Sequence, residues 1–366
     1  MHLRDHLSAA WLRLTRHIDG PLMAIVLLLL AVGAVVLFSA LAPDTDRFIQ
    51  QIKSVGIALV VMWIVANIAP HRLAQIALPL YLLGVLMLIG VALFGVTVNG
   101  SQRWLALGGF RFQPSELLKL AVPLLLAWYF QKAEARITFS NFLVAMLLIA
   151  IPTWLIKRQP DLGTAMLVAA SGFYVLYLAR LSWKVIVVLT ASAVPLVWLF
   201  AHDYQKQRVL SFLDPAADPL RSGYHTLQAT IAIGSGGVTG KGWMNGTQTH
   251  LDFLPERHTD FIFAVYGEEF GLVGNIVLLA LYTALLVRAL MIASHASSLF
   301  DRLLAGTITL MIFTYAAVNM GMVSGILPVV GVPLPFVSYG GTALLSLFIC
   351  IGILMSIQTH RKLVAT

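Results

Sequence analysis

The chain has 366 residues, of which 59% are hydrophobic and only 11% are charged. This composition excludes an ordinary soluble domain of the same length, which would need more polar surface, and it indicates a polytopic membrane protein. The formal net charge of +8 gives no support to nucleic-acid binding, because the basic residues are scattered at the ends of apolar segments rather than gathered in one patch.

Apolar segments close to the roughly 20 residues needed to cross a bilayer recur along the whole sequence. Each must be helical within lipid, because hydrocarbon offers no partner to a free backbone N–H or C=O. We therefore predict an all-α fold with about ten transmembrane helices, in a single domain over residues 1–366. The predicted spans are 21–41, 52–69, 73–95, 115–131, 141–157, 163–179, 183–201, 261–293, 303–327 and 339–358.

The Lys and Arg residues of the short connecting segments predict that both termini lie in the cytoplasm. Residues 1–20 then form a cytoplasmic, amphipathic N-terminal segment. The run Ala40–Ala42 resembles a signal-peptidase site, but the apolar region before it is too long for a secretory signal and further spans follow. Cys350 is the single cysteine, so no internal disulfide can form.

The outer connection before the fourth span contains GSQRWLALGGFRFQPSELLKL, Gly100–Leu120. It supplies two cations, Arg103 and Arg111. Glu116 and Lys119 follow in the first turn of the span, and their spacing of three residues brings them close enough to pair. A structural ion pair and the wall of a polar cavity are both open interpretations.

Asp161 lies in IKRQPDLGT, between the fifth and sixth spans. Aspartate is a favoured helix N-cap, and the residues from Leu162 onward are typical of a helix. The neighbouring Lys157 and Arg158 make an anion site the alternative.

The connection over residues 202–259 is too long for a simple loop and is expected to be functional. Its apolar residues favour a segment that folds back on the membrane surface, with a short amphipathic helix at Tyr224–Gly234. The glycine-rich turn Gly234–Gln248 does not match a nucleotide phosphate loop. Its backbone amides, with Lys241, are predicted either to cradle a pyrophosphate or to form a flexible turn.

The stretch LDFLPERHTDFIFAVYGEE concentrates ionisable groups where the eighth span begins. Asp260 falls at or next to the helix N-terminus, where the helix dipole favours an ionised carboxylate. An N-cap role is the alternative, and Thr259 competes for it. Glu268 and Glu269 lie deeper in the span, where we expect structural polar contacts.

The segment Ile326–Gly341, ILPVVGVPLPFVSYGG, has three prolines and three glycines at the junction of two spans. Irregular backbone at such depth is tolerated only where it is buried in protein or lines a wet cavity. These features together predict an outward-facing polar cavity under a long loop. An ion pump and an enzyme acting on a lipid-linked head group both fit this description, and residue spacing alone does not choose between them.

Several stretches resemble sequences of the SEDS family (shape, elongation, division and sporulation). The resemblance covers nearly the whole chain and rests on GSQRW, QPDLGT, IAIGSGG, FLPERHTDFIFA and PVVGVPLPFVSYGG. The last two are more similar to the elongation branch of the family than to its division branch.

This resemblance implies a peptidoglycan glycosyltransferase that polymerises lipid II at the outer face of the cytoplasmic (inner) membrane, during cell elongation and rod-shape maintenance. The essential acid of the family matches Asp260, which is expected to act as catalytic base. An α-linked donor and a β-1,4 product imply inversion in one displacement. Such a step needs one base and no general acid, unlike the two carboxylates of glycoside hydrolases.

The remaining candidates are expected to bind substrate, with the cations holding the pyrophosphate. They are Arg103, Trp104, Arg111, Gln113, Ser115, Glu116, Lys119, Asp161, Lys241, Glu256, Arg257, His258, Thr259 and Ser338. No cofactor is firmly predicted, but a divalent cation, Mg²⁺ or Mn²⁺, can supplement these charges, with Asp161, Glu256 and Asp260 as possible ligands.

Family membership also implies partners: a class B penicillin-binding protein that cross-links the new strand, and other membrane proteins of the elongation complex. Small residues between Arg302 and Leu327 favour close helix packing at that interface. A lipid II flippase and a non-enzymatic scaffold of the elongation complex are the alternative functions.

Overall fold

The computed structural model describes residues 15–360 except residues 43, 99–100, 108–109, 135–136, 200–205, 207–221 and 251–255. The described chain is mostly helical, as predicted. Its helices are α2 (Gly20–Leu41), α3 (Thr45–Ala66), α4 (Pro70–Phe94), α5 (Pro114–Lys132), α6 (Phe139–Arg158), α7 (Leu162–Leu178), α8 (Trp183–Leu199), α10 (Ser222–Ser235), α11 (Thr247–His250), α12 (Ile262–Ser294), α13 (Leu299–Val323) and α14 (Gly341–Thr359).

Among these described helices, 7 are long and apolar enough to cross a membrane: α2, α3, α4, α6, α12, α13 and α14. The other three predicted spans coincide with α5, α7 and α8. Helices α7 and α8 have 17 residues each, and α5 carries the charges of Glu116 and Lys119 within its first turns. Each of the ten predicted spans therefore contains a helix, but some predicted spans run past the ends of their helices: α3 ends at Ala66, α13 ends at Val323 and α14 begins at Gly341.

Helix starts follow the capping chemistry of the sequence. The side chain of Asp19 accepts a hydrogen bond from the amide of Leu22 at the start of α2. Thr138 caps α6 in the same way, and Ser298 caps α13. Each of these side chains satisfies one backbone N–H that has no partner within the helix.

A small antiparallel sheet is an addition that the all-α prediction missed. Its strands are β1 (Val96–Val98), β2 (Ser101–Leu107) and β3 (Phe110–Phe112), in the order β1-β2-β3. Trp104 of β2 lies opposite Val96 of β1, and Leu105 lies opposite Phe112 of β3. Pairing the strands satisfies the backbone groups of this outer connection without a helix.

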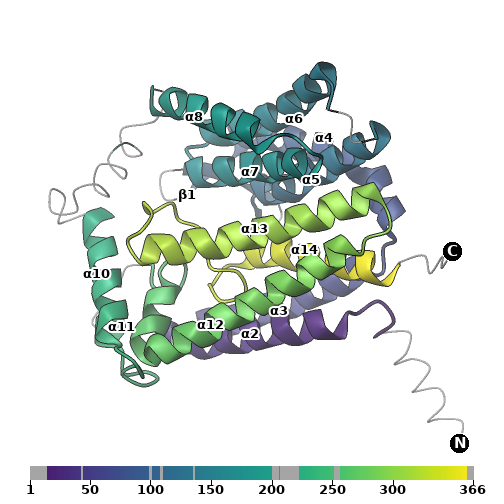
Figure 1. Ribbon diagram of the computed structural model, residues 1–366. Coiled ribbons are helices and arrows are strands. Elements are labelled where there is room, and N and C mark those ends of the chain that lie inside the picture. The colour runs from purple at the N-terminus through teal and green to yellow at the C-terminus, as the bar shows by residue number, and fades with distance from the viewer. Residues whose placement is uncertain are drawn as a thin grey trace, which may run out of the picture.

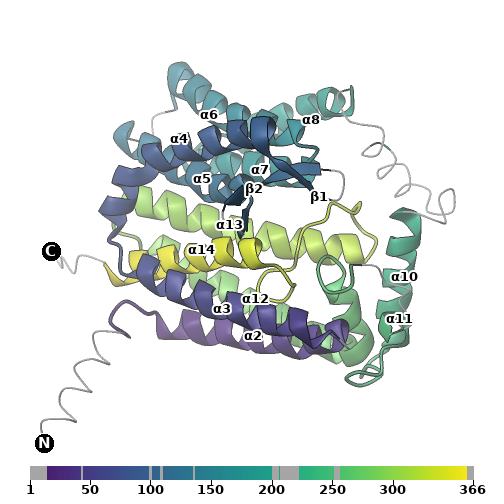
Figure 2. The ribbon, with the colours of Figure 1, turned by 180° about the vertical axis from the view of Figure 1, so that it is seen from behind.

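The long helices run along one common direction, and α10 lies across one end of them, near α11 and β1 (Figures 1 and 2). Helix α2 begins, and α14 ends, at the opposite end. The rings of His17 and His360 stack there at 4.3 Å between centroids. The two ends of the described chain are therefore neighbours, as expected of termini on one side of a membrane.

Helices α13 and α14 form the centre of the bundle: in an apolar stretch of 18 residues in each, 67% and 61% of the residues are buried. Helix α14 packs on α3, and α12 packs on α13 and α2. The segment that joins α13 to α14 therefore emerges from the middle of the molecule, where it touches several helices at once.

The N-terminal residues 1–14 and part of the predicted loop over residues 202–259, namely 202–205, 207–221 and 251–255, lie outside the described residues. The short helix predicted at Tyr224–Gly234 is confirmed as α10. The glycine-rich turn follows it directly.

Candidate functional site

The segment between α13 and α14, Ile326–Gly341, is here named the proline loop. A Cβ placed on Gly163 of α7 would come within 2.8 Å of Val330, and a Cβ on Gly331 would come within 3.3 Å of Oδ2 of Asp260. The loop thus fills the space between the start of α7 and the Asp260 carboxylate. Its backbone is irregular, as predicted; residues 332 and 334–338 are buried, whereas Ile326, Leu327 and Gly331 are exposed.

The turn that precedes α12 is fastened to the proline loop. The hydroxyl of Ser338 donates to the carbonyl of Thr259 (2.6 Å) and accepts from the amide of Leu334 (2.8 Å). The amide of Tyr339 donates to the carbonyl of His258 (2.8 Å). These bonds join residues that are far apart in the sequence and fix the backbone next to Asp260.

Asn319 of α13 completes this attachment. Its amide group donates to the carbonyl of Asp260 (2.9 Å) and to the carbonyl of Val332 (2.7 Å). One buried side chain therefore holds the turn and the loop together. Sequence reasoning missed Asn319; the available signal was a polar residue within an apolar span, where polar groups are costly and are usually functional.

The capping interpretation of Asp260 and Thr259 is wrong. The residue at the cap position of α12 is Phe261, and no side chain caps this helix. The hydroxyl of Thr259 instead donates to Oε2 of Glu256 (3.0 Å). Asp260 lies just outside the helix, partly buried, with its carboxylate next to Gly331.

Asp161 is confirmed as the N-cap of α7, because its Oδ1 accepts from the amide of Thr164 (3.1 Å). Its Oδ2 lies 3.4 Å from the guanidinium of Arg103 and 3.3 Å from the side-chain nitrogen of Gln113. Arg103 also donates to the carbonyl of Pro160 (2.6 Å). Strand β2, the start of α5 and the start of α7 thus bring three predicted site residues together.

Of the two cations in the alternative anion site beside Asp161, Arg158 contacts a ring of its own helix, and the site stays a prediction. The guanidinium of Arg158 lies over the ring of Trp154, 4.0 Å from its centroid. This cation–π contact directs the Arg158 charge to its own helix.

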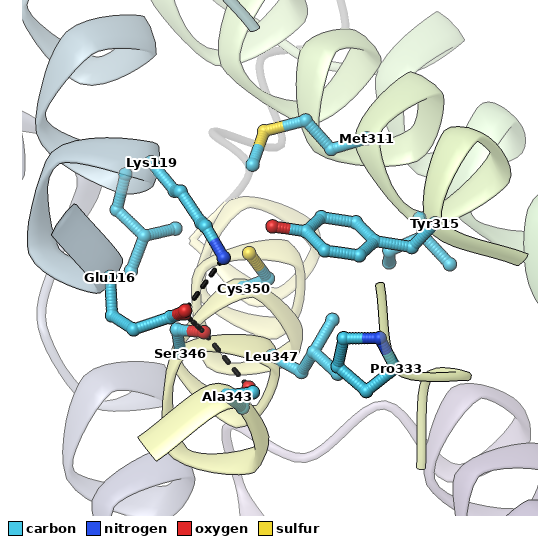
Figure 3. Close-up of a pocket in the computed structure, with 11 residues that line it drawn as sticks. Glu116, Lys119, Met311, Tyr315, Pro333, Ala343, Ser346, Leu347 and Cys350 are labelled. Atoms are coloured by element: carbon cyan, nitrogen blue, oxygen red, sulfur yellow. Dashed lines mark hydrogen bonds and ion pairs between the residues drawn. The ribbon is translucent and has the colours of Figure 1, made fainter. Parts of the chain in front are cut away.

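Glu116 and Lys119 form the predicted ion pair, with 2.6 Å between Oε1 and Nζ. Ser346 of α14 donates to the other carboxylate oxygen (2.9 Å), and the Lys119 ammonium lies 5.2 Å from the centre of the Tyr315 ring. Figure 3 shows these groups facing one small cavity, which Pro333 of the proline loop also lines. The ion-pair interpretation is therefore confirmed, whereas the cavity beside the pair is lined mainly by apolar side chains and is not the polar cavity of the other interpretation.

This cavity has a volume of about 20 Å³, which is room for about one water molecule. The side chains of Glu116 and Lys119 are only 9% and 6% exposed. The Lys119 ammonium thus lies within the bundle, paired with a carboxylate, and a pyrophosphate group does not fit beside it in this conformation.

The glycine-rich turn is docked on α12, and its segment Gly236–Gly242 is here named the glycine clasp. Helix α12 is broken at Gly271, whose φ is 63°. The clasp amides of Lys241 and Gly242 donate to the carbonyls of Glu268 and Glu269 (both 3.0 Å). These two amides are therefore not available as a pyrophosphate cradle, and hydrogen bonds hold the turn against α12.

Side chains reinforce the clasp. The Lys241 ammonium lies 2.7 Å from Oε1 of Glu268, which also accepts from the amide of Gln248 (3.0 Å). Glu269 accepts a hydrogen bond from Ser39 of α2. The structural role expected of Glu268 and Glu269 is confirmed, and the positive charge of Lys241 is already matched by a carboxylate.

The other candidates lie around the turn before α12. Arg257 donates to the carbonyl of Ala40 at the end of α2 (2.8 Å). His258 contacts the Tyr339 ring edge to face, with centroids 5.7 Å apart, and burial lowers the pKa of its imidazole. A lowered pKa keeps this ring neutral near pH 7. Glu256 is exposed.

The last candidates belong to the sheet and to the start of α5. Trp104 of β2 is half-buried, and Ser115 is buried in the first turn of α5. Arg111 belongs to β3, but its side chain lies outside the described part of the structure.

The three possible metal ligands, Asp161, Glu256 and Asp260, are not gathered into one site. Among the described residues no three His, Cys, Asp or Glu side chains lie close enough to hold a metal ion. A site built from these three carboxylates alone is therefore not supported, and the use of Mg²⁺ or Mn²⁺ stays a prediction.

Fold and site together define a multi-pass membrane protein with a polar, loop-lined site at the end of the bundle opposite its termini. Residues 21–363 match the FtsW/RodA/SpoVE family of cell cycle proteins. The chain belongs to this family, which confirms the resemblance in its sequence motifs.

Known proteins are similar over almost the full length. The chain is 51% identical over 353 residues to the peptidoglycan glycosyltransferase MrdB of Escherichia coli K12, covering 95% of each chain. It is 33% identical to the probable peptidoglycan glycosyltransferase FtsW of Geobacter metallireducens, covering 92% of this chain and 95% of that one.

Solved structures share the fold. A chain from a peptidoglycan synthase complex, described as coordinating polymerization and crosslinking, superposes with a TM-score of 0.81 at 33% identity, covering 94% of this chain and 99% of that one. The rod shape determining protein RodA of Thermus thermophilus superposes with a TM-score of 0.72 at 30% identity, covering 94% and 98%.

Proposed function

We propose that this chain is a peptidoglycan glycosyltransferase that polymerises lipid II into glycan strands at the outer face of the membrane. Support for the activity comes from the relatives with that name, one of them 51% identical over 95% of the chain. The structural observation that carries the proposal is the Asp260 carboxylate, which lies outside α12, beside Gly331. It belongs to a turn that hydrogen bonds hold in place.

The proposed reaction is a single inverting displacement. Asp260 takes the proton of the acceptor sugar hydroxyl, and the oxygen of that hydroxyl attacks the anomeric carbon of the donor. The bond between that carbon and the pyrophosphate oxygen breaks, and undecaprenyl pyrophosphate leaves with the electron pair. The pyrophosphate needs no proton to leave, so one base is sufficient. A positioned base contributes roughly 10²–10⁴-fold to such a step.

The charge of the leaving pyrophosphate requires cations. Arg103 is our first candidate, because its side chain is 31% exposed and its contact with Asp161 is 3.4 Å long, whereas Lys119 and Lys241 lie 2.6 and 2.7 Å from their glutamates. A divalent cation would neutralise the remaining charge. Mg²⁺ typically uses one or two carboxylates together with substrate phosphates, and Asp260 or Asp161 would serve here without a cluster of three protein ligands.

A transpeptidase of the class B penicillin-binding type is the proposed partner, with the elongation complex as the setting. The similar solved chain comes from a complex described as coordinating polymerization with crosslinking, and another is named for rod shape. The proposed polymerase makes strands that are not yet cross-linked. It fits such an assembly because cross-linking needs a separate active site, which the transpeptidase would supply.

The test is the Asp260→Asn variant, purified with its penicillin-binding partner and supplied with lipid II. The amide keeps the shape of the side chain and removes its basicity, so we expect loss of glycan products on gels by roughly 10²-fold or more. Complex formation should remain. The same assay with a chelator tests the divalent cation.

Asp46→Asn is the matched control, because Asp46 is an exposed acid in the first turn of α3. It should polymerise at the wild-type rate. Full activity of Asp260→Asn would reject the base assignment. A wild-type protein that only moves lipid II between leaflets would instead establish the flippase alternative.

A further inference from the structure

Asn319 is fully buried in α13 and uses both of its amide hydrogens on carbonyl oxygens from two different segments. One carbonyl belongs to Asp260, in the turn before α12, and the other belongs to Val332 of the proline loop. Two carbonyl acceptors at 2.9 and 2.7 Å fix the orientation of the amide, because only its nitrogen can donate to them.

The carbonyl oxygen of the Asn319 side chain, Oδ1, is buried and has no hydrogen-bond partner within the described residues. A buried acceptor without a partner is unfavourable and calls for an explanation in each case. A leucine of similar volume would remove this cost but would leave the carbonyls of Asp260 and Val332 without their donor. The two donors aimed at two segments therefore account for an asparagine here.

The geometry around Asp260 shows what those donors achieve. Gly331 lies next to Val332, and its Cα faces Oδ2 of Asp260 so closely that a Cβ there would stand 3.3 Å from that oxygen. The amide of Asn319 thus sets the spacing between the carboxylate and the loop beside it. Ser338 and Tyr339 hold the preceding residues, Thr259 and His258, and Asn319 donates to the carbonyl of Asp260 itself.

We infer that Asn319 is a positioning residue, which holds the Asp260 backbone against the proline loop and so aims the carboxylate at the acceptor hydroxyl. This inference rests on the proposed function. Asn319 touches no reacting atom and acts through the Asp260 carbonyl, so it should affect the chemical step more than the binding of lipid II.

The first experiment compares Asn319→Leu with wild type in the polymerisation assay with the penicillin-binding partner. We expect kcat to fall about tenfold or more, because a small displacement of a catalytic group has a large effect on rate. KM for lipid II should stay within about twofold, since uniform binding is untouched. A rise in KM at unchanged kcat would overturn the inference.

Asn275→Leu is the matched control. Asn275 lies on α12 and also carries a buried Oδ1 without a partner among the described residues, but no hydrogen bond joins it to the Asp260 turn. It should change kcat by less than about twofold. Equal losses in both variants would show that any buried asparagine of the bundle has this effect, which contradicts a specific positioning role.

The second variant, Asn319→Asp, tests the inference even if the leucine variant folds poorly. A carboxylate cannot donate to the two carbonyls, whereas a protonated carboxyl group can donate to one. The rate of Asn319→Asp relative to wild type should therefore rise as the pH is lowered from about 8 to about 6, because protonation restores one of the two donors. A flat ratio overturns the inference.

The controls separate this inference from the proposed function. A wild-type protein without polymerase activity would reject the function, and an active Asp260→Asn variant would reject the base. If the wild type is active, Asp260→Asn is inactive and Asn319→Leu keeps full kcat, then the positioning role alone fails.

Discussion

Gly331 of the proline loop lies beside the carboxylate of Asp260, the proposed base. Gly331 has a φ of 77°, and a Cβ there would stand 3.3 Å from Oδ2 of Asp260. Two separate requirements therefore favour glycine: a left-handed backbone and space for the carboxylate. A nearby glycine, Gly325, has the same kind of backbone, with a φ of 72°, but its Cβ would meet only methyl groups of Thr230 and Thr226.

We predict that Gly331→Ala lowers the polymerisation rate roughly 10- to 100-fold, because the added methyl group displaces the carboxylate. Gly325→Ala should lose a similar stability, about 1–2 kcal/mol for a left-handed alanine, but keep most of its rate. Thermal unfolding and lipid II polymerisation measured on both variants check this. Equal rates would mean that the carboxylate tolerates the methyl group.

Helix α12 is interrupted, and the glycine clasp supplies hydrogen-bond partners for the backbone groups at the break. The break at Gly271 leaves backbone groups without helical partners, and the glycine clasp satisfies them: Leu272 donates to the carbonyl of Gly237 (2.9 Å) and Val273 to that of Val238 (3.0 Å). The approach is so close that a Cβ on Gly240 would lie 2.1 Å from the Glu269 carbonyl oxygen. Broken helices in membranes persist only with such support.

We predict that Gly240→Ala detaches the clasp, whereas Gly237→Ala does not. Both residues have positive φ values, 82° and 56°, but a Cβ on Gly237 would meet no atom within 4 Å. The Gly240 variant should therefore lose about 1–3 kcal/mol more than its control through overpacking. Thermal unfolding midpoints give the difference, and faster hydrogen exchange at Leu272 and Val273 would locate it. Indistinguishable variants would contradict the docking of the clasp.

The whole molecule separates its chain ends from its candidate site. His17 and His360 stack at one end of the bundle, and α10, α11 and the sheet lie at the other (Figures 1 and 2). If the basic connecting segments face the cytoplasm, as their charge predicts, the Asp260 turn faces the periplasm, where lipid II is polymerised in the proposed function.

We predict that a membrane-impermeant maleimide labels Asp46→Cys in intact spheroplasts but labels Ser297→Cys only after the membrane is disrupted. Both positions are exposed, at opposite ends of the bundle, and the native Cys350 is buried and should not react. Labelling read by gel shift checks the orientation. The reverse pattern would place the Asp260 turn in the cytoplasm and exclude the proposed reaction there.

Local chemistry explains which predictions succeeded. Helical spans follow from apolar runs, the N-cap at Asp161 from residue type, and the pairing of Glu116 with Lys119 from their spacing on one helix face. Each depends on residues close together in the chain. The small sheet at Val96–Phe112 was missed because its strands are too short for a clear alternation of polar and apolar residues.

The sequence by itself determined the membrane class, the order of the helices and the family, and it singled out Asp260 as the proposed base, because periodic hydropathy and contiguous motifs are local properties. Only the tertiary structure decided which groups face one another. It engages Lys241 with Glu268, encloses Lys119 beside Glu116 and brings Asn319 to the Asp260 carbonyl. The physical reason is that a buried charge or amide takes whichever partner packing brings within hydrogen-bond distance, and here those partners come from distant helices and loops.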